Sequence, residues 1–219
     1  MLGQEKALKL LKMLVGRSSA DQMEAILMTE DSSLTRFTPD SVHQHVAEVN
    51  ETLILRVVLG KQIAVVTTNA LDARTLKETL EDSMGLARLL PPKHDFVSLP
   101  GPRPIAPAKT FFENIRLLTP QKKVGIIRDL SKVVRESGCR VSGAFSHGTV
   151  EVSVANSLGV EAYQQYSDIF MHLILQSGAD QDGGGSGYAA FASRDCGGFD
   201  WEPLAREAVS KARRGSPVS

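Results

Sequence analysis

The sequence has few of the residues that stabilise secreted proteins or anchor proteins in membranes. It has only two cysteines, Cys139 and Cys196, so two free thiols in a reducing compartment are favoured over one disulfide. The longest apolar run, Leu53–Leu59, is interrupted by Arg56 and is far too short to span a bilayer. The start of the chain shows no signal peptide. We therefore expect a cytoplasmic protein without a membrane partner.

Neither sign of charge is in excess, because 25 Lys and Arg residues balance 25 Asp and Glu residues. Non-specific binding to nucleic acid depends on neutralising phosphates and therefore needs a basic surplus. A regulator that acts directly on DNA is disfavoured for this reason, and no nucleic-acid partner is expected.

The motifs of common hydrolytic sites are missing as well. The sequence has no His-Glu-x-x-His, no Cys-x-x-Cys and no Asp-rich calcium loop. Ser146 and His147 are adjacent on a predicted strand, where neighbouring side chains point to opposite faces and cannot form a nucleophile–base pair. The Gly-rich run 183–187 lacks the Lys-Ser/Thr pair of a phosphate loop, so it is interpreted as a turn. We expect no catalytic residue and no metal ligand here.

Two histidines on one predicted strand are the candidate site residues. His43 and His45 are two positions apart, so their side chains share a face and could reach one metal ion. No third ligand stands at a suggestive spacing. A solvated or groove-facing pair is therefore favoured over a metal site.

Hydrophobic periodicity predicts an α+β fold of antiparallel β-meanders with helices packed on one face, in two layers. Helices are expected at 4–15, after an Asp72 cap, after a Thr119 cap with Val124 facing inward, and after an Asp200 cap. Eight strands are expected, at 22–30, 41–50, 52–59, 62–68, 140–146, 151–156, 161–175 and 188–193. Each half then has the order helix, four strands, helix, which suggests two similar α-β4-α halves.

Prolines divide the chain. Residues 91–107 contain six prolines and a glycine, a density that predicts a linker or an extended crossing of the surface. The expected organisation is a first α+β unit at 1–90, a Pro-rich linker at 91–109 and a second α+β unit at 110–219. Both units could also form one compact domain.

The apolar run Leu53–Leu59 also bears on assembly. Because strand residues alternate between faces, this run gives its strand two apolar faces. Helices of the same unit can cover one face, and the other needs a second cover, which a missing carboxy-terminal half, a sister protomer or the second set of strands after the linker could supply. We expect a dimer with an interface supplied by exposed apolar strand surface.

Short motifs spread along the chain occur in the order found in one protein family. They are Leu34-Thr-Arg-Phe37, Val42-His-Gln-His45, Leu55-Arg-Val-Val-Leu-Gly60, Thr67-Thr-Asn69, Leu71-Asp72, Val154-Ala-Asn-Ser-Leu-Gly159, Ser186-Gly-Tyr188, Arg194-Asp195 and Leu204-Ala-Arg-Glu-Ala208. Together they resemble the amino-terminal domain of the TldD/PmbA family. Members are metallopeptidases or their metal-free partner subunits, once described as modulators of DNA gyrase.

The resemblance implies the non-catalytic, amino-terminal domain of a zinc metallopeptidase system that degrades unfolded peptides. In the family this domain walls the peptide cavity, and dimers enclose that cavity. The implied partners are an unfolded peptide or protein and a second copy or a family paralogue, in a homodimer or heterodimer. His43 and His45 fall in a family-matched strand and are expected to be surface or groove residues rather than metal ligands. Zinc is expected only in a carboxy-terminal half, on a His-Glu-x-x-x-His motif absent here. The alternative is a stand-alone binding or scaffold protein that has lost the catalytic half.

Overall fold

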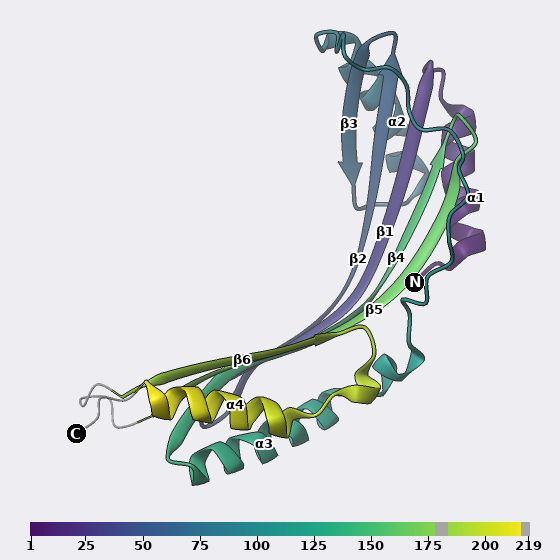
Figure 1. The fold of residues 1–219 in the computed structure, drawn as a ribbon. Coiled ribbons are helices and arrows are strands. Elements are labelled where there is room, and N and C mark those ends of the chain that lie inside the picture. The colour runs from purple at the N-terminus through teal and green to yellow at the C-terminus, as the bar shows by residue number, and fades with distance from the viewer. Residues whose placement is uncertain (178–183, 216–219) are drawn as a thin grey trace. The chain divides into compact units, whose positions relative to one another are not determined.

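The computed structural model describes residues 1–177 and 184–215 and shows one open six-stranded sheet with helices (Figure 1). The strands are β1 (Gln22–Phe37), β2 (Val42–Leu59), β3 (Gln62–Thr68), β4 (Cys139–Asn156), β5 (Glu161–Ser177) and β6 (Ser186–Ser193), in the spatial order β3-β2-β1-β4-β5-β6. The helices of this part of the chain are α1 (Gln4–Arg17), α2 (Ala73–Leu89), α3 (Pro120–Glu136) and α4 (Trp201–Arg214), with short 3-10 turns η1 (Glu113–Leu117) and η2 (Cys196–Gly198). The pairs β2–β3 and β5–β6 are antiparallel, and the expected α+β class is confirmed.

Two stretches named in the sequence analysis fall partly outside the described residues. The Gly-rich run begins at Gly183, which lies outside the described residues. The expected second unit also includes residues 178–182 and 216–219, which lie outside them too. Within residues 1–177 and 184–215, no helix is long and apolar enough to cross a membrane.

The strands are fewer and longer than the pattern predicts. β2 runs unbroken through the two segments expected at 41–50 and 52–59, and β4 through those expected at 140–146 and 151–156. The expectation of eight strands, four in each half, is therefore wrong. Polar stretches such as Asn50-Glu51 and His147-Gly148 look like turns in isolation, yet pairing within the sheet keeps them extended.

Contacts divide the chain into two compact units, each assembled from separate segments. The first consists of Met1–Asp31, Val49–Lys109 and Val150–Gln165, and the second of Ser32–Glu48, Thr110–Thr149 and the described part of Tyr166–Ser219. These units differ from the contiguous ranges 1–90 and 110–219, because β1, β2, β4 and β5 each contribute residues to both. Residues 91–109 belong to the first unit.

In the first unit, α1 and α2 cover the odd-numbered side chains of β1, β2 and β4 and the even-numbered Ala64 of β3. Met23, Ala25 and Leu27 of β1 are buried in one cluster with Leu11 and Leu14 of α1. The cluster is completed by residues of β2, β3, β4 and α2, namely Leu53, Leu55, Val57, Ala64, Leu76, Leu80, Ala87 and Ala155, with Ala7 of α1. Strict alternation therefore directs one face of each strand toward the helices.

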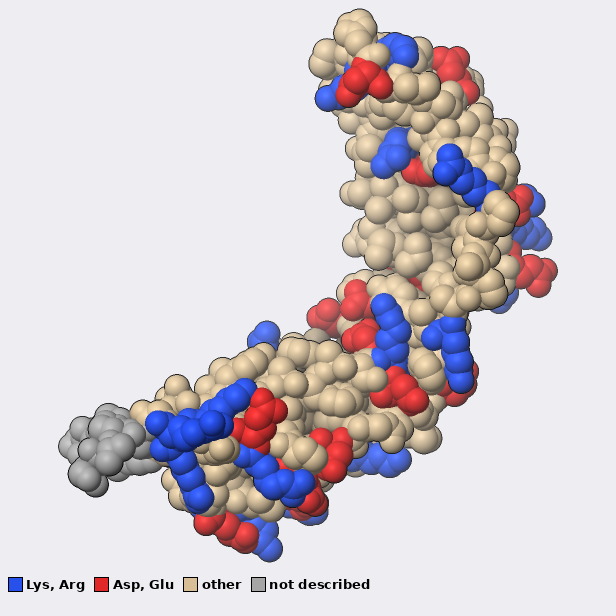
Figure 2. Space-filling view, in the orientation of Figure 1, with Lys and Arg blue, Asp and Glu red and all other residues tan. Residues whose placement is uncertain are grey.

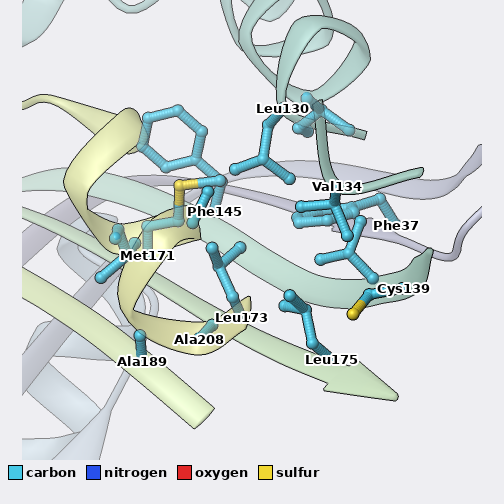
Figure 3. Packing of buried hydrophobic residues seen from close by; sticks show 14 of the residues in the cluster. Phe37, Leu130, Val134, Cys139, Phe145, Met171, Leu173, Leu175, Ala189 and Ala208 are labelled. Atoms are coloured by element: carbon cyan, nitrogen blue, oxygen red, sulfur yellow. The ribbon is translucent and has the colours of Figure 1, made fainter. Parts of the chain in front are cut away.

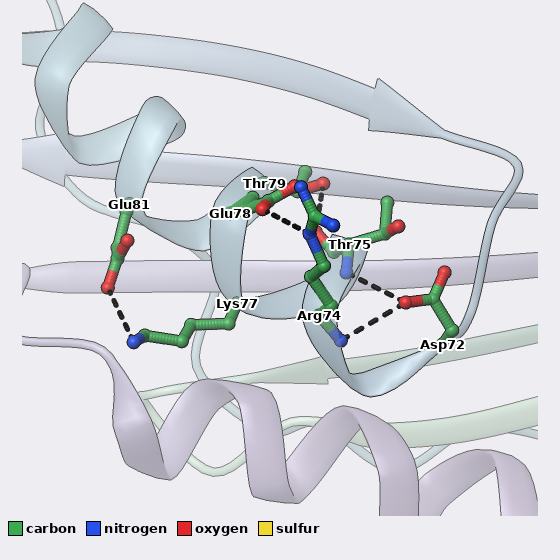
Figure 4. Close-up of polar contacts among 7 residues, drawn as sticks. All are labelled: Asp72, Arg74, Thr75, Lys77, Glu78, Thr79 and Glu81. Carbon is green, nitrogen blue, oxygen red and sulfur yellow. Dashed lines mark hydrogen bonds and ion pairs between the residues drawn. The ribbon is translucent and has the colours of Figure 1, made fainter.

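The start of α2 shows how closely local sequence specifies a helix end (Figure 4). The Asp72 carboxylate accepts hydrogen bonds from the backbone N–H groups of Arg74 (3.1 Å) and Thr75 (3.0 Å), which otherwise have no partner inside the helix. These hydrogen bonds lower the pKa of Asp72, and the bond from the Thr75 N–H contributes most. The ion pair between Arg74 and Glu78 follows one turn later at 2.8 Å. The predicted Asp72 cap is confirmed.

In the second unit, α3 and α4 cover the odd-numbered side chains in the same manner (Figure 3). Phe145 of β4 and Met171 and Leu173 of β5 pack with Leu130 and Val134 of α3. The approach of α4 is close, and Gly187 of β6 lies directly beneath its Ala208.

One predicted core position of α3 is wrong. Val124 was expected to face inward, but its side chain is 47% exposed. The buried stripe instead runs through Lys123, Ile127, Leu130 and Val134. These positions have the spacing of a single helix face, and the stripe centre falls on the lysine rather than on its neighbour.

The second face of β2 along Leu53–Leu59 is partly buried within its own chain, although Arg56 of that face is exposed. Leu53, Leu55 and Val57 pack under the helices, and Val58, which points the other way, is also buried. The proline-rich segment crosses this side of the sheet as an extended chain, one of the two alternatives expected for it. Its Leu99 N–H donates to Gln22 Oε1 (2.8 Å) of β1.

Candidate functional site

The face of the sheet opposite α3 and α4 carries an apolar stripe on β5 and β6. Phe170 is 36% exposed, Ile174 47% and Tyr188 52%. The imidazole of His172 lies between the two aromatic rings, with centroid distances of 5.6 Å to Phe170 and 6.4 Å to Tyr188. We call these four residues the aromatic stripe.

Strand alternation and the β5–β6 register create the stripe. The odd-numbered residues of β5, among them Ile169 and Met171, are buried under the helices, so Phe170, His172 and Ile174 face the other way. The antiparallel register places Ile174 opposite Tyr188. The run 169–175 is thus apolar on both faces, apart from His172, and only one face is covered.

The stripe lies at an edge of the sheet. β6 is the last strand in the order, so one of its sides has no strand beside it in the described part of the chain. One backbone group of β6 is engaged, since Lys211 Nζ donates to the Tyr188 carbonyl at 2.8 Å. An edge strand with adjacent apolar side chains suits an extended peptide, because backbone pairing and side-chain contacts occur together.

The structure does not bring His43 and His45 to this stripe. Both are exposed residues of β2. His45 Nδ1 lies 2.8 Å from Thr35 Oγ1, and Thr35 is an odd-numbered residue of β1, on the side that carries the helices. Their role in a groove remains a prediction. The aromatic stripe was missed, although the apolar run 169–175 was a visible signal of a strand with two apolar faces.

A buried lysine forms a second unusual feature of this unit. The side chain of Lys123 is 0% exposed, and it forms no salt bridge among the residues described. Its ammonium donates to the carbonyl (3.0 Å) and hydroxyl (2.9 Å) oxygens of Ser33 and lies 5.6 Å from the centroid of the Phe145 ring. Burial lowers the pKa of Lys123 to about 8.

His147 lies near this lysine. Burial, with smaller contributions from the charges of Lys123 and His45, lowers the pKa of His147 to about 4. Its Nδ1 is buried and has no hydrogen-bond partner in the described part of the chain. Ser146, the preceding residue, directs its hydroxyl to the Phe170 carbonyl at 3.5 Å, so the two do not form a nucleophile–base pair. Burial lowers the pKa of both Lys123 and His147, so the charged form of each is disfavoured relative to an exposed side chain.

We expect replacement of Lys123 by methionine to leave the free energy of unfolding at neutral pH unchanged or to raise it by about 1–3 kcal/mol, because the uncompensated buried charge disappears. Between about pH 8 and 10.5 the unfolded chain binds more protons at this lysine than the folded one does. As pH rises through this interval, the free energy of unfolding of wild type should therefore increase relative to that of the variant. Urea unfolding of both proteins across this interval measures the difference. Lys122→Met, at the exposed neighbour, is the control and should show no such trend. A constant difference between Lys123→Met and wild type would contradict the assignment.

No site for a metal ion is apparent among residues 1–177 and 184–215, where no three or more His, Cys, Asp or Glu side chains come together in a way that could hold one. Both cysteines are free thiols, as expected.

Comparison with known proteins finds one matching family model and several solved structures with the same fold. Residues 113–215 match the family described as the PmbA/TldA metallopeptidase central domain. No curated protein matches the sequence. The fold is shared with TldE from Thermococcus kodakarensis, at 20% identity over 93% of this chain and a TM-score of 0.84. It is also shared with candidate modulators of DNA gyrase from Bacteroides thetaiotaomicron (13% identity over the whole chain, TM-score 0.86) and Thermotoga maritima (13% over 93%, TM-score 0.77).

Residues 113–215 thus carry a TldD/PmbA-family domain, and the resemblance of the chain's motifs to that family is confirmed. The matched segment is the family's central domain, whereas the motifs were compared with the amino-terminal one. The chain spans about half the length of the solved structures, 46%, 52% and 47% respectively. At these identities the structural likeness shows the fold alone.

Proposed function

We propose that this chain is a non-catalytic part of a TldD/PmbA-like zinc metallopeptidase system and that it holds an unfolded peptide in extended form. The observation that carries the proposal is the aromatic stripe beside the edge strand β6. The family match supports the peptidase context. The zinc of such a system would be bound by the family's His-Glu-x-x-x-His motif, which does not occur in this sequence. Two free thiols favour a cytoplasmic location.

The physics of such binding is that of adding a strand to a sheet. An incoming peptide would place its backbone along β6, and every second side chain would lie on the uncovered face. Burying an apolar side chain completely contributes roughly 1.5–3 kcal/mol, and partly exposed rings such as Phe170 and Tyr188 would contribute a fraction of that each. This favours peptides with apolar residues at alternate positions.

We expect the double variant Phe170→Ser/Tyr188→Ser to bind a fluorescently labelled, unfolded apolar peptide at least about tenfold more weakly than wild type, a loss of about 1.4 kcal/mol. Fluorescence anisotropy measures the affinity. Leu117→Ser is the matched control, since Leu117 is an exposed apolar residue of the same unit on η1. The peptide should remain intact with zinc present, as mass spectrometry can verify. An equal loss in the control, or zinc-dependent cleavage, would contradict the proposal.

We also propose that the protein forms a dimer, as a homodimer or with a family paralogue, through uncovered apolar strand surface. The support for this is the aromatic stripe rather than Leu53–Leu59, because Val58 on the second face of that run is buried within its own chain. Light scattering across a dilution series should show a monomer–dimer equilibrium that Phe170→Ser/Tyr188→Ser shifts toward monomer. A wild-type chain that stays monomeric at high concentration, alone and with its paralogue, would exclude this assembly.

A further inference from the structure

A hollow with an apolar floor lies on the outer side of the helix pair in the second unit. Val133 of α3 and Ala205 and Val209 of α4 line it, and its volume is about 400 Å³. Val133 is 45% exposed although it is a large apolar residue. The size falls within the range of roughly 300–1,000 Å³ typical of ligand sites.

The rim of this hollow is basic. Arg206, Arg213 and Arg214 line it, and no acidic residue is among its lining residues. Figure 2 shows Lys and Arg gathered over the end of α4. The chain as a whole has no net charge, so this excess is local. The corresponding hollow between α1 and α2 has a mixed rim, with Arg17 and Lys77 beside Glu81.

Two of the arginines are held by neutral groups. Arg213 Nη2 donates to the Ser137 carbonyl at the end of α3 (2.8 Å), and Arg214 Nε donates to the Ser210 carbonyl (3.3 Å). Neutral partners fix each guanidinium without compensating its charge. Arg206 pairs with Glu202 at 3.2 Å, but both side chains are largely exposed, and such pairs contribute little.

A purely structural role explains only part of this arrangement. Cations in the last turn of a helix interact favourably with its carboxy-terminal end, which accounts for Arg213 and Arg214. Arg206 stands in the amino-terminal half of α4, where a cation gains nothing from the helix end. The exposure of Val133 is also not explained by helix stability.

We propose that the groove between α3 and α4 binds an acidic peptide segment of a partner protein. An apolar side chain of that segment would fill the space above Val133 and Val209, and flanking carboxylates would pair with Arg206 and Arg214. Planar guanidinium groups suit this role because they bind carboxylates through two parallel hydrogen bonds. This interaction is independent of the aromatic stripe, because that stripe faces away from α3 and α4.

The test uses the full 219-residue chain. The probe is a short fluorescent peptide in which leucines alternate with glutamate and aspartate, and two comparison peptides replace the acids with their amides or with lysine. Anisotropy should show binding of the acidic peptide that weakens with added salt, and at least about tenfold weaker binding of both comparison peptides. This part of the test does not depend on any variant of the protein.

Arg206→Gln/Arg214→Gln should weaken binding of the acidic peptide at least about tenfold, whereas the control Arg17→Gln/Lys77→Gln, in the hollow of the first unit, should leave it unchanged. Thermal unfolding verifies that both variants fold. Three results would overturn the proposal: equal binding of the amide peptide, equal effects of the two double variants, or tighter binding of a duplex DNA oligonucleotide than of the acidic peptide.

Discussion

Replacing Gly187 with alanine should lower the free energy of unfolding by at least about 3 kcal/mol. A Cβ atom at this position would lie 2.0 Å from the Ala208 carbonyl oxygen and 2.7 Å from the Ala212 nitrogen. Both are backbone atoms of α4, so no side chain can rotate away and the helix itself must shift. The shift would separate α4 from β6 and open the core of the second unit.

Urea denaturation gives the change, and thermal unfolding should show it as a fall in Tm of several degrees, since about 1 kcal/mol corresponds to roughly 2–4 °C in a chain of this size. Gly125→Ala in α3 is the control. A Cβ there meets no atom within 4 Å, and alanine is the better helix former, so that variant should gain about 0.5–1 kcal/mol. If the two substitutions had the same effect, the close approach of α4 to β6 would be disproved.

Replacing Glu151 with alanine should cost about 2–4 kcal/mol of stability in the first unit. The Glu151 carboxylate of β4 is buried and accepts hydrogen bonds from the backbone N–H groups of Leu2 (2.9 Å) and Gly3 (3.2 Å) and from the Tyr163 hydroxyl (2.8 Å). The amino-terminal end of α1 has no side-chain cap of its own. A carboxylate from the distant strand β4 takes that role, and alanine would leave three donors without it.

The phenol of Tyr163 provides a direct readout. The pKa of Tyr163 is raised above its ordinary value of 10.0, mainly by burial and secondly by the hydrogen bond to the Glu151 carboxylate. Since the folded state holds this proton more tightly than the unfolded one, stability should fall as pH rises above about 10. In Glu151→Ala the phenolate absorbance should appear at lower pH than in wild type. Glu161→Ala, which removes the exposed partner of Lys12, should change stability by less than about 1 kcal/mol. An unchanged titration in Glu151→Ala would contradict the contact.

The helix ends could be predicted because their determinants are local. Asp72, Thr119 and Asp200 each accept a hydrogen bond from a backbone N–H two or three residues later, so a few neighbouring letters suffice. The Asn156–Gly159 turn is local in the same sense: the Asn156 side chain accepts bonds from the N–H groups of Leu158 and Val160, two and four residues later, and Gly159 has a φ of 92°.

Strand lengths and the candidate site depend on residues far apart in the chain. Asn50 stays extended within β2 because neighbouring strands pair there, and no local signal reports such pairing. His43 and His45 were selected because two histidines stand two positions apart. The contact of His172 with Tyr188 instead follows from the register of β5 and β6, which only the assembled sheet defines. Lys123 occupies a core position for a similar reason, since its hydrogen-bond partner Ser33 is 90 positions away.

The sharing of long strands between the two units limits how this protein can be divided or recombined. The segment 113–215, which carries the family match, includes Val150–Gln165 of the first unit but lacks Ser32–Glu48 of the second. Expressed alone, it would leave Phe145 and Leu130 without Phe37, their neighbour in the same cluster, and would remove β1 from beside β4. Exchange of gene segments between relatives would therefore have to transfer both halves of each core together. A swap at the proline-rich crossing would join strands of different ancestry within both cores at once.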